Sequence, residues 1–202
     1  MTGTAAHTVT WDALLSHPDV EEHSREAGAL GFMAFHGGLE AGTAEIAEEA
    51  AAVAGASLYV VRQPSKLRWH VPSHSVDPAG SYRLRRWLSH VRVAVALHGY
   101  GRTDQPGRIL LGGRNRVLAA GLAYSLTLRL PHLPAVTYLD DIPRELRGLH
   151  PANPVNRPAQ SGVQVELPPR ARDRRLDPAA PGLVVEALVA AAEAYALPDR
   201  LP

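Results

Sequence analysis

The sequence predicts an α/β fold in which a mixed, mostly parallel sheet is flanked by helices. Short apolar runs alternate along the chain with segments of helical period, which is the order typical of βαβ units. The central runs, such as residues 91–98 (VRVAVALH), are also nearly all apolar. Strands have this composition when both faces of a parallel sheet are covered. The length of 202 residues suits a single domain over residues 1–202.

Local signals place the individual elements. Thr43 can cap a helix at 43–54, Glu45 suits its first turn, and Gly55 follows its last residue. Pro181 falls near the first turn of a C-terminal helix. We expect helices at 9–17, 43–54, 82–89, 115–128 and 181–196. We expect strands within 27–36 and at 57–62, 91–98, 108–112, 136–139 and 162–167. Residues 69–74 should form a short strand or loop, and residues 78–80 a turn.

The expected strand at 162–167 (GVQVEL) has a period of two. Its apolar residues share one face, while Gln164 and Glu166 share the other. The pattern alone favours a solvent-facing Glu166. If that face lines a cleft instead, burial raises the pKa of the carboxyl group, and such a group suits general base catalysis.

Composition narrows the classes of function. The formal net charge is +1, so no overall charge favours nucleic acid or a membrane surface as partner. The chain has no cysteine, so any metal must be held by His, Asp or Glu. The first 16 residues do not resemble a secretion signal, and no apolar run approaches the roughly 20 residues that span a bilayer. We therefore expect a cytoplasmic protein.

Two histidines each close an apolar run and are each followed by glycine. His36 precedes two glycines, with Glu40 four residues further on, and His98 precedes a single glycine. Ligands bind at the carboxyl ends of strands in α/β sheets, and two imidazoles with a carboxylate suit a three-ligand catalytic zinc site. Each histidine taken alone is more often a hydrogen-bonded core residue than a metal ligand. Together they favour a metal-dependent hydrolase.

Arginines are candidates for binding an anionic substrate, because the planar guanidinium can hold a carboxylate through two hydrogen bonds. The candidates are Arg114, Arg157 and Arg172. The proline-rich stretch 142–158 is expected to form a long active-site loop.

Two further groups of residues are open to several interpretations. His70 and His74 could be additional ligands, proton donors or surface residues. The basic stretch 170–175 (RARDRR) is short, is interrupted by Asp173 and lacks aromatic residues, so a solvated loop is favoured over a nucleic-acid site.

Taken in order, the motifs resemble the poly-γ-glutamate hydrolase family. The matching core spans about residues 28–176. It includes FHGGLEAGT at 35–43, SLY at 57–59, the segment 67–73, LHG at 97–99, LGG at 111–113, NPVNR at 153–157 and GVQVEL at 162–167. The family usually carries three glycines after the first histidine, whereas this chain has two.

The resemblance implies a zinc-carboxypeptidase-like fold and hydrolysis of γ-glutamyl amide bonds by water that zinc activates. Carried over by position, His36, Glu40 and His98 would hold the zinc ion, and Glu166 would be the general base. The expected substrate is a small or polymeric anionic peptide-like molecule.

Asn156 and Arg157 fall where the resemblance implies that a substrate carboxylate could bind, and Arg114 is the third predicted substrate-binding residue. Two alternatives stay open. One is a zinc amidase that acts on another substrate, such as a cell-wall peptide or an N-acyl amino acid. The other is a non-catalytic module that binds nucleic acid or protein.

Overall fold

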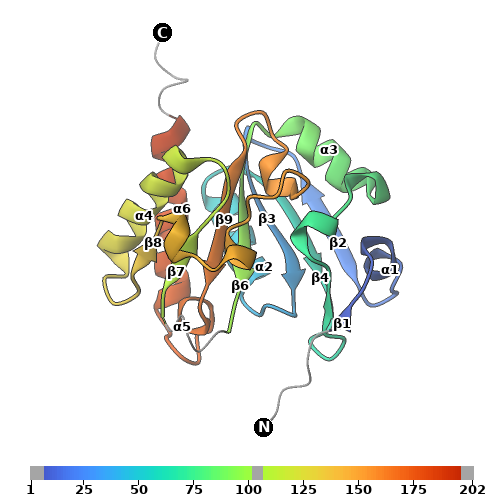
Figure 1. Cartoon of the computed structure of the whole chain (residues 1–202), viewed down its shortest axis with the longest axis horizontal. Coiled ribbons are helices and arrows are strands. Elements are labelled where there is room, and N and C mark those ends of the chain that lie inside the picture. The colour runs from blue at the N-terminus through green and yellow to red at the C-terminus, as the bar shows by residue number, and fades with distance from the viewer. Residues whose placement is uncertain (1–6, 102–106, 197–202) are drawn as a thin grey trace.

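A seven-stranded mixed sheet forms the centre of the molecule. The computed structural model describes residues 7–101 and 107–196. The strands are β2 (Glu21–Arg25), β3 (Leu30–Gly37), β4 (Ser57–Arg62), β6 (Val93–Gly99), β7 (Ile109–Leu111), β8 (Ala135–Val136) and β9 (Gly162–Leu167). Their order is β2-β4-β3-β6-β9-β7-β8 (Figure 1). The four central strands β4, β3, β6 and β9 are parallel, whereas β2 and β7 are antiparallel to their central neighbours.

Helices cover both faces of this sheet. They are α1 (Trp11–Leu15), α2 (Thr43–Val53), α3 (Tyr82–His90), α4 (Arg116–Arg129), α5 (Pro169–Arg172) and α6 (Ala180–Ala196). Figure 1 shows α4 and α6 on one side of the sheet and α1 and α3 on the other. The predicted α/β class with a mostly parallel sheet is confirmed.

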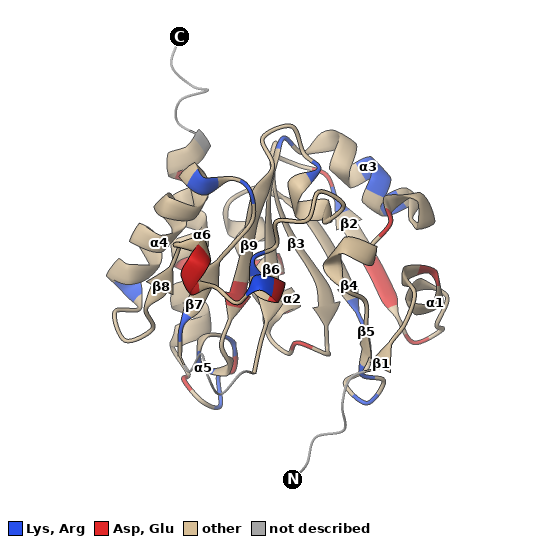
Figure 2. Ribbon diagram, in the orientation of Figure 1, with Lys and Arg blue, Asp and Glu red and all other residues tan. Residues whose placement is uncertain are grey.

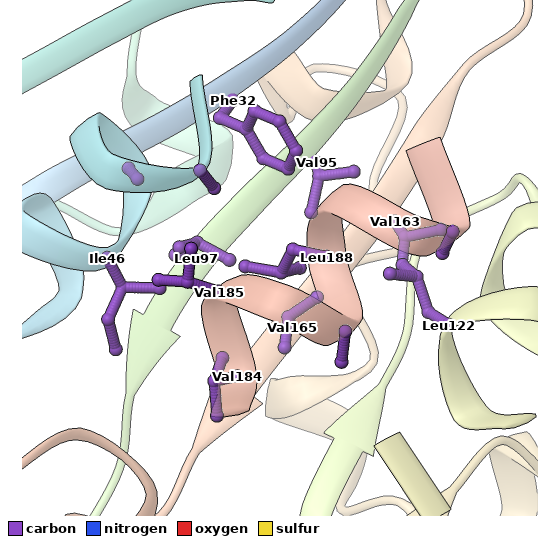
Figure 3. Packing of buried hydrophobic residues seen from close by; sticks show 14 of the residues in the cluster. Phe32, Ile46, Val95, Leu97, Leu122, Val163, Val165, Val184, Val185 and Leu188 are labelled. Carbon is purple, nitrogen blue, oxygen red and sulfur yellow. The ribbon is translucent and has the colours of Figure 1, made fainter. Parts of the chain in front are cut away.

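The larger core lies between the sheet and helices α2, α4 and α6. Figure 3 shows α6 in its centre, with Val185 and Leu188 against Leu97 and Val165 of the sheet. The predicted face of β9 is therefore correct, because its apolar residues all join this core. Burying such side chains contributes about 1.5–3 kcal/mol each relative to leaving them in water.

The second core lies on the opposite face of the sheet. Here Met33 and Phe35 of β3 and Tyr59 of β4 pack against Trp87 of α3 and Trp11 of α1. The main contacts of helix α3 with the sheet are with β2 and β4. Over β6 and β9 the same face is covered by loops, which border the functional site.

Two local expectations are corrected by the structure. Thr43 does not cap α2, because the N-cap is Gly42 at φ +90°, and the Thr43 hydroxyl donates to the carbonyl oxygen of Glu40 instead. The edge strand β2 is absent from the sequence prediction, because its residues EEHSR contain no apolar run.

A separate two-stranded parallel pair lies beside the main sheet. It joins β1 (His7–Thr8) to β5 (Trp69–His70), and β5 is followed by a 3-10 turn at Ser73–Ser75. The sequence analysis expects no secretion signal in the first 16 residues. Of these, residues 1–6 lie outside the described residues. Among the helices of residues 7–101 and 107–196, none is both long and apolar enough to span a membrane.

Candidate active site

A cleft of about 490 Å³ opens at the carboxyl ends of the central parallel strands. Its floor contains His36, His98 and Glu166, from the ends of β3, β6 and β9, together with Glu40. One wall is formed by residues 70–74 and the other by residues 144–153. The predicted long loop at 142–158 therefore does border the cleft.

A β-bulge directs His36 into this cleft. Strict alternation along β3 would place His36 with Phe32 and Ala34, which face the core under α2 and α6. Between Ala34 and Gly37, however, β3 contains one residue more than its partner β4. An extra residue in one strand reverses the side-chain alternation beyond it. The ring of His36 consequently lies on the loop-covered face of the sheet.

The two-glycine turn brings Glu40 back to His36. Gly38 has φ +83°, and a Cβ there would lie 1.8 Å from the Gln63 carbonyl oxygen, so only glycine fits. The amide of Glu40 donates to the His36 carbonyl oxygen at 2.8 Å. This turn has one glycine fewer than is usual in the family that the motifs resemble. It nevertheless places the carboxylate of Glu40 beside the imidazole of His36.

The Glu40 carboxylate lies between two histidines. Its Oε1 is 3.0 Å from Nδ1 of His36, and its Oε2 is 3.5 Å from Nδ1 of His98. Oε2 also accepts a hydrogen bond from the amide of Gly99 at 2.8 Å. Burial disfavours the charged carboxylate, but His36 and then His98 outweigh it and hold the pKa of Glu40 well below its usual range.

A neutral His36 has a single N–H, but both of its ring nitrogens face oxygen atoms that accept hydrogen bonds. Its Nε2 lies 2.9 Å from the Val71 carbonyl oxygen, which can only accept, so Nε2 carries the proton. Its Nδ1 then directs a lone pair at Glu40, which is the orientation of a metal-ligating histidine held by a backbone carbonyl. Burial lowers the pKa of His36, yet the Glu40 carboxylate and the Val71 carbonyl together raise it.

The separations of the Glu40 carboxylate from the two histidines suit a zinc ion. Zinc–nitrogen and zinc–oxygen bonds of about 2.1 Å at a tetrahedral angle separate two ligand atoms by roughly 3.4 Å, and the 3.0 and 3.5 Å separations from Glu40 to His36 and His98 bracket that value. The other ring nitrogen of His98, Nε2, is buried without a hydrogen-bond partner among the described residues and takes no part in these contacts. A cation bound between Glu40 and the histidines would balance the negative charge of the Glu40 carboxylate.

Glu166 lies directly beside His98. The two residues are Cα partners on the parallel strands β6 and β9, and both side chains are only 3% exposed. The solvent-facing interpretation that the pattern favoured for Glu166 is therefore wrong. Burial raises the pKa of Glu166 to about 7, against the opposing effect of His98.

A short hydrogen-bond chain positions the Glu166 carboxylate. Nε2 of Gln164 donates to Oε1 of Glu166 at 2.7 Å, and Nδ2 of Asn153 donates to Oε1 of Gln164 at 2.8 Å. Asn153 thereby fixes the orientation of the Gln164 amide. Sequence reasoning missed both partners, and the only signal for Gln164 is that it shares a strand face with Glu166.

His70 is a fourth donor at the same place. Its ring centroid is 4.8 Å from that of His36, and possible ligand atoms of His70, His36 and Glu40 all lie within 4.8 Å of one another. Burial and the neighbouring His36 lower the pKa of His70 to about 4. The sequence singled out His70 but could not assign its role.

The three predicted substrate-binding residues do not line the cleft. Asn156 is buried, and its side chain bonds the backbone of Gly148, His150 and Arg114, so it braces the 144–153 wall. The guanidinium of Arg114 donates to the Leu149 carbonyl oxygen, and that of Arg157 to the Ala152 carbonyl oxygen. Their predicted contact with substrate stays a prediction.

Other basic groups do border the cleft or its floor. Arg144 and the imidazoles of His74 and His150, whose ring centroids are 5.2 Å apart, line the walls. Arg172 lies beneath the floor, where it donates to the carbonyl oxygens of Ala41 and Leu167. Figure 2 shows acidic and basic residues mixed over the surface, while β3 and β6 carry neither.

The comparison with protein families decides the assignment. The poly-γ-glutamate hydrolase family model matches residues 12–178, most of the chain. The chain belongs to the poly-γ-glutamate hydrolase family. The resemblance read from the motifs is thus confirmed. Among curated proteins, none matches the sequence significantly.

Solved structures support the same assignment. A bacteriophage poly-γ-glutamate hydrolase is 25% identical with a TM-score of 0.70, covering 89% of this chain and 91% of that one. The zinc-free apo form of a protein named YNDL is also 25% identical with a TM-score of 0.70, covering 87% and 90%. A metallo-carboxypeptidase from Burkholderia cenocepacia is more distant, at 8% identity and a TM-score of 0.49, covering 91% and 68%. The family and the fold support a hydrolase.

Proposed function

We propose that this chain is a zinc-dependent hydrolase that cleaves γ-glutamyl amide bonds. The observation that carries the proposal is the Glu40 carboxylate, whose two oxygens face the Nδ1 atoms of two buried histidines, His36 and His98, at the floor of a cleft. These three residues would hold the zinc ion. The zinc-free YNDL structure and the bacteriophage hydrolase are consistent with zinc and with a γ-glutamyl polymer.

Zinc bound at this position would lower the pKa of a water molecule and polarise the carbonyl group of the substrate. Glu166 is the base for that water. Its carboxylate removes a proton from the attacking water and later donates it to the nitrogen of the leaving amine. A pKa raised to about 7 by burial suits both transfers, because the group can be either ionised or protonated near neutral pH.

The hydrogen-bond chain behind Glu166 supports this role. Gln164 donates to Oε1 of Glu166 and therefore leaves Oε2 available for the proton. Because Asn153 fixes the Gln164 amide, the carboxylate is held in one orientation. Preorganised groups of this kind lose little free energy to reorientation during the reaction.

The walls of the cleft suit an anionic substrate. Each residue of a γ-linked glutamate polymer keeps a free α-carboxylate. Arg144 lines the wall opposite residues 70–74, and no ion pair occupies its guanidinium within the described part of the chain. An arginine in this position can bind such a carboxylate through two hydrogen bonds.

A substrate panel tests the proposal. Zinc-loaded protein is incubated with poly-γ-glutamate, poly-α-glutamate, a cell-wall peptide and an N-acyl amino acid, and newly formed amines are measured. The proposal predicts release from poly-γ-glutamate that a chelator abolishes and that zinc restores. Release from only one of the other substrates, or release that is insensitive to the chelator, would contradict it.

A further inference from the structure

His70 lies beside the candidate zinc ligands, but a catalytic zinc ion does not require it as a further ligand. A catalytic zinc takes three protein ligands and keeps one position open, whereas four donors surround this place. Among the described residues, possible ligand atoms of His36, Glu40 and His70 lie within 4.8 Å of one another, and this grouping does not include His98. We nevertheless assign His98 as the third ligand, for three reasons. Its Nδ1 faces Glu40 at 3.5 Å, it is fully buried on a central strand, and it projects from the floor beside Glu166. His70 is half-buried on the short strand β5 at the cleft wall.

The backbone holds His70 firmly on both sides. The side-chain amide of Gln63 bonds both the amide and the carbonyl group of Trp69, at 2.8 and 2.6 Å. The His70 carbonyl oxygen accepts from the amide of Val9 at 3.0 Å. The next carbonyl, that of Val71, accepts from Nε2 of His36. The wall that carries His70 is therefore tied directly to the ligand His36.

The ring of His70 is available for a ligand in the cleft. Its centroid is 4.8 Å from that of His36 with an interplanar angle of 38°. Within residues 7–101 and 107–196 no hydrogen-bond partner is seen for either ring nitrogen. An imidazole has at least one N–H donor, and here that donor is not used by another group among the described residues.

We infer that His70 is a catalytic residue, whose imidazole N–H donates a hydrogen bond to the carbonyl oxygen of the scissile amide. This inference rests on the proposed hydrolase function. As the water oxygen bonds to the amide carbon, the π electrons of the carbonyl move onto its oxygen, and His70 stabilises the negative charge there. Glu166 takes the water proton and returns it to nitrogen as the carbon–nitrogen bond breaks. His70 keeps its own proton throughout.

Zinc content separates this role from that of a ligand. We expect His70→Leu and His70→Gln to retain about one zinc per chain, as wild type does. Loss of zinc from both variants, together with its retention in His98→Ala, would make His70 the third ligand and overturn the inference. That result would also replace His98 in the proposed ligand set, whereas hydrolysis of γ-glutamyl bonds is tested separately by the substrate panel.

The kinetic pattern separates a transition-state contact from a binding contact. We expect kcat on poly-γ-glutamate to fall about 10²–10³-fold in His70→Leu while KM changes little, since the loss of one oxyanion donor has this size. His70→Gln retains an N–H donor and should recover part of the rate. His132→Ala, which removes an exposed histidine outside the cleft, is the control and should stay close to wild type. Equal rates for wild type and His70→Leu would refute the role.

Affinity for a transition-state analogue gives a readout that does not depend on turnover. The probe is a phosphinic analogue of γ-glutamyl-glutamate, with binding measured by calorimetry on the zinc-loaded proteins. In His70→Leu its affinity should fall by the same factor as kcat/KM, whereas affinity for glutamate should not change. An unchanged affinity for the phosphinic probe would exclude the contact. Absence of hydrolysis by wild type would instead count against the proposed function.

Discussion

His98 and Glu166 are directly opposite each other on the parallel strands β6 and β9, and both are buried at the floor of the cleft. Paired residues of neighbouring parallel strands direct their side chains to the same face. A candidate ligand and a candidate base are thereby fixed side by side by the hydrogen-bonded register of the sheet.

Glu166→Gln should separate metal binding from turnover. Glutamine keeps the size of the side chain but cannot accept the water proton, so kcat should fall about 10²–10⁴-fold while zinc content is unchanged. Rates on poly-γ-glutamate and metal analysis of the same preparations measure this. Glu145→Gln, which alters another carboxyl group of the cleft wall, is the control and should retain turnover. Undiminished turnover in Glu166→Gln would exclude this residue as the base.

The same substitution should change the pH dependence of stability in the zinc-free protein. The pKa of Glu166 is raised to about 7 in the folded state, so between its ordinary pKa and pH 7 the folded chain binds a proton that the unfolded chain has lost. Folding stability therefore falls as the pH rises through that window. Glu166→Gln should be more stable than wild type by on the order of 3 kcal/mol at pH 8 and by much less at pH 5.

Urea unfolding of chelator-treated proteins at the two pH values measures this difference. A stability difference between Glu166→Gln and wild type that is the same at pH 5 and pH 8 would show that the Glu166 carboxyl group is not destabilised by burial.

Gly38→Ala should damage both the fold and the site. The residue has φ +83°, and the added methyl group would overlap the Gln63 carbonyl oxygen, so the turn that carries Glu40 must move. Gly55→Ala is the matched control, since it has φ +60° with nothing within 4 Å and should cost only about 1 kcal/mol. We expect Gly38→Ala to cost at least about 2 kcal/mol more and to weaken zinc binding. Equal losses in the two variants would argue against a tight turn.

Arg144→Gln tests which arginine binds the substrate. Arg144 lines the cleft, whereas Arg157 lies outside it. Arg144→Gln should raise KM for poly-γ-glutamate about tenfold with little change in kcat, as expected for loss of a charge-assisted hydrogen bond. Arg157→Gln should leave KM unchanged. The opposite ranking would restore the prediction made from the NPVNR motif.

Much of the site could be predicted because its residues terminate recognisable strands. The apolar runs before His36 and His98 locate the carboxyl ends of β3 and β6. The period of two in β9 places Gln164 and Glu166 on one face. What covers that face could not be predicted, because the cover comes from segments near residues 70 and 150, and no local pattern links these to β9.

Two features depend on tertiary geometry that the sequence does not encode locally. The direction of His36 depends on the bulge in β3, which is visible only against the register of β4. The bracing role of Asn156 depends on Gly148 and His150, which lie along the same loop but meet it only after folding. The motif around Asn156 and Arg157 therefore predicted a functional loop but not which residues of the loop face the cleft.

In the proposed enzyme, His36, Glu40 and His98 hold one zinc ion. Metal analysis of purified wild type, His36→Ala and His98→Ala, with His74→Ala as control, tests it most directly. We expect about one zinc per chain in wild type and in His74→Ala, and almost none in the other two variants. Full zinc occupancy in either His36→Ala or His98→Ala would contradict it.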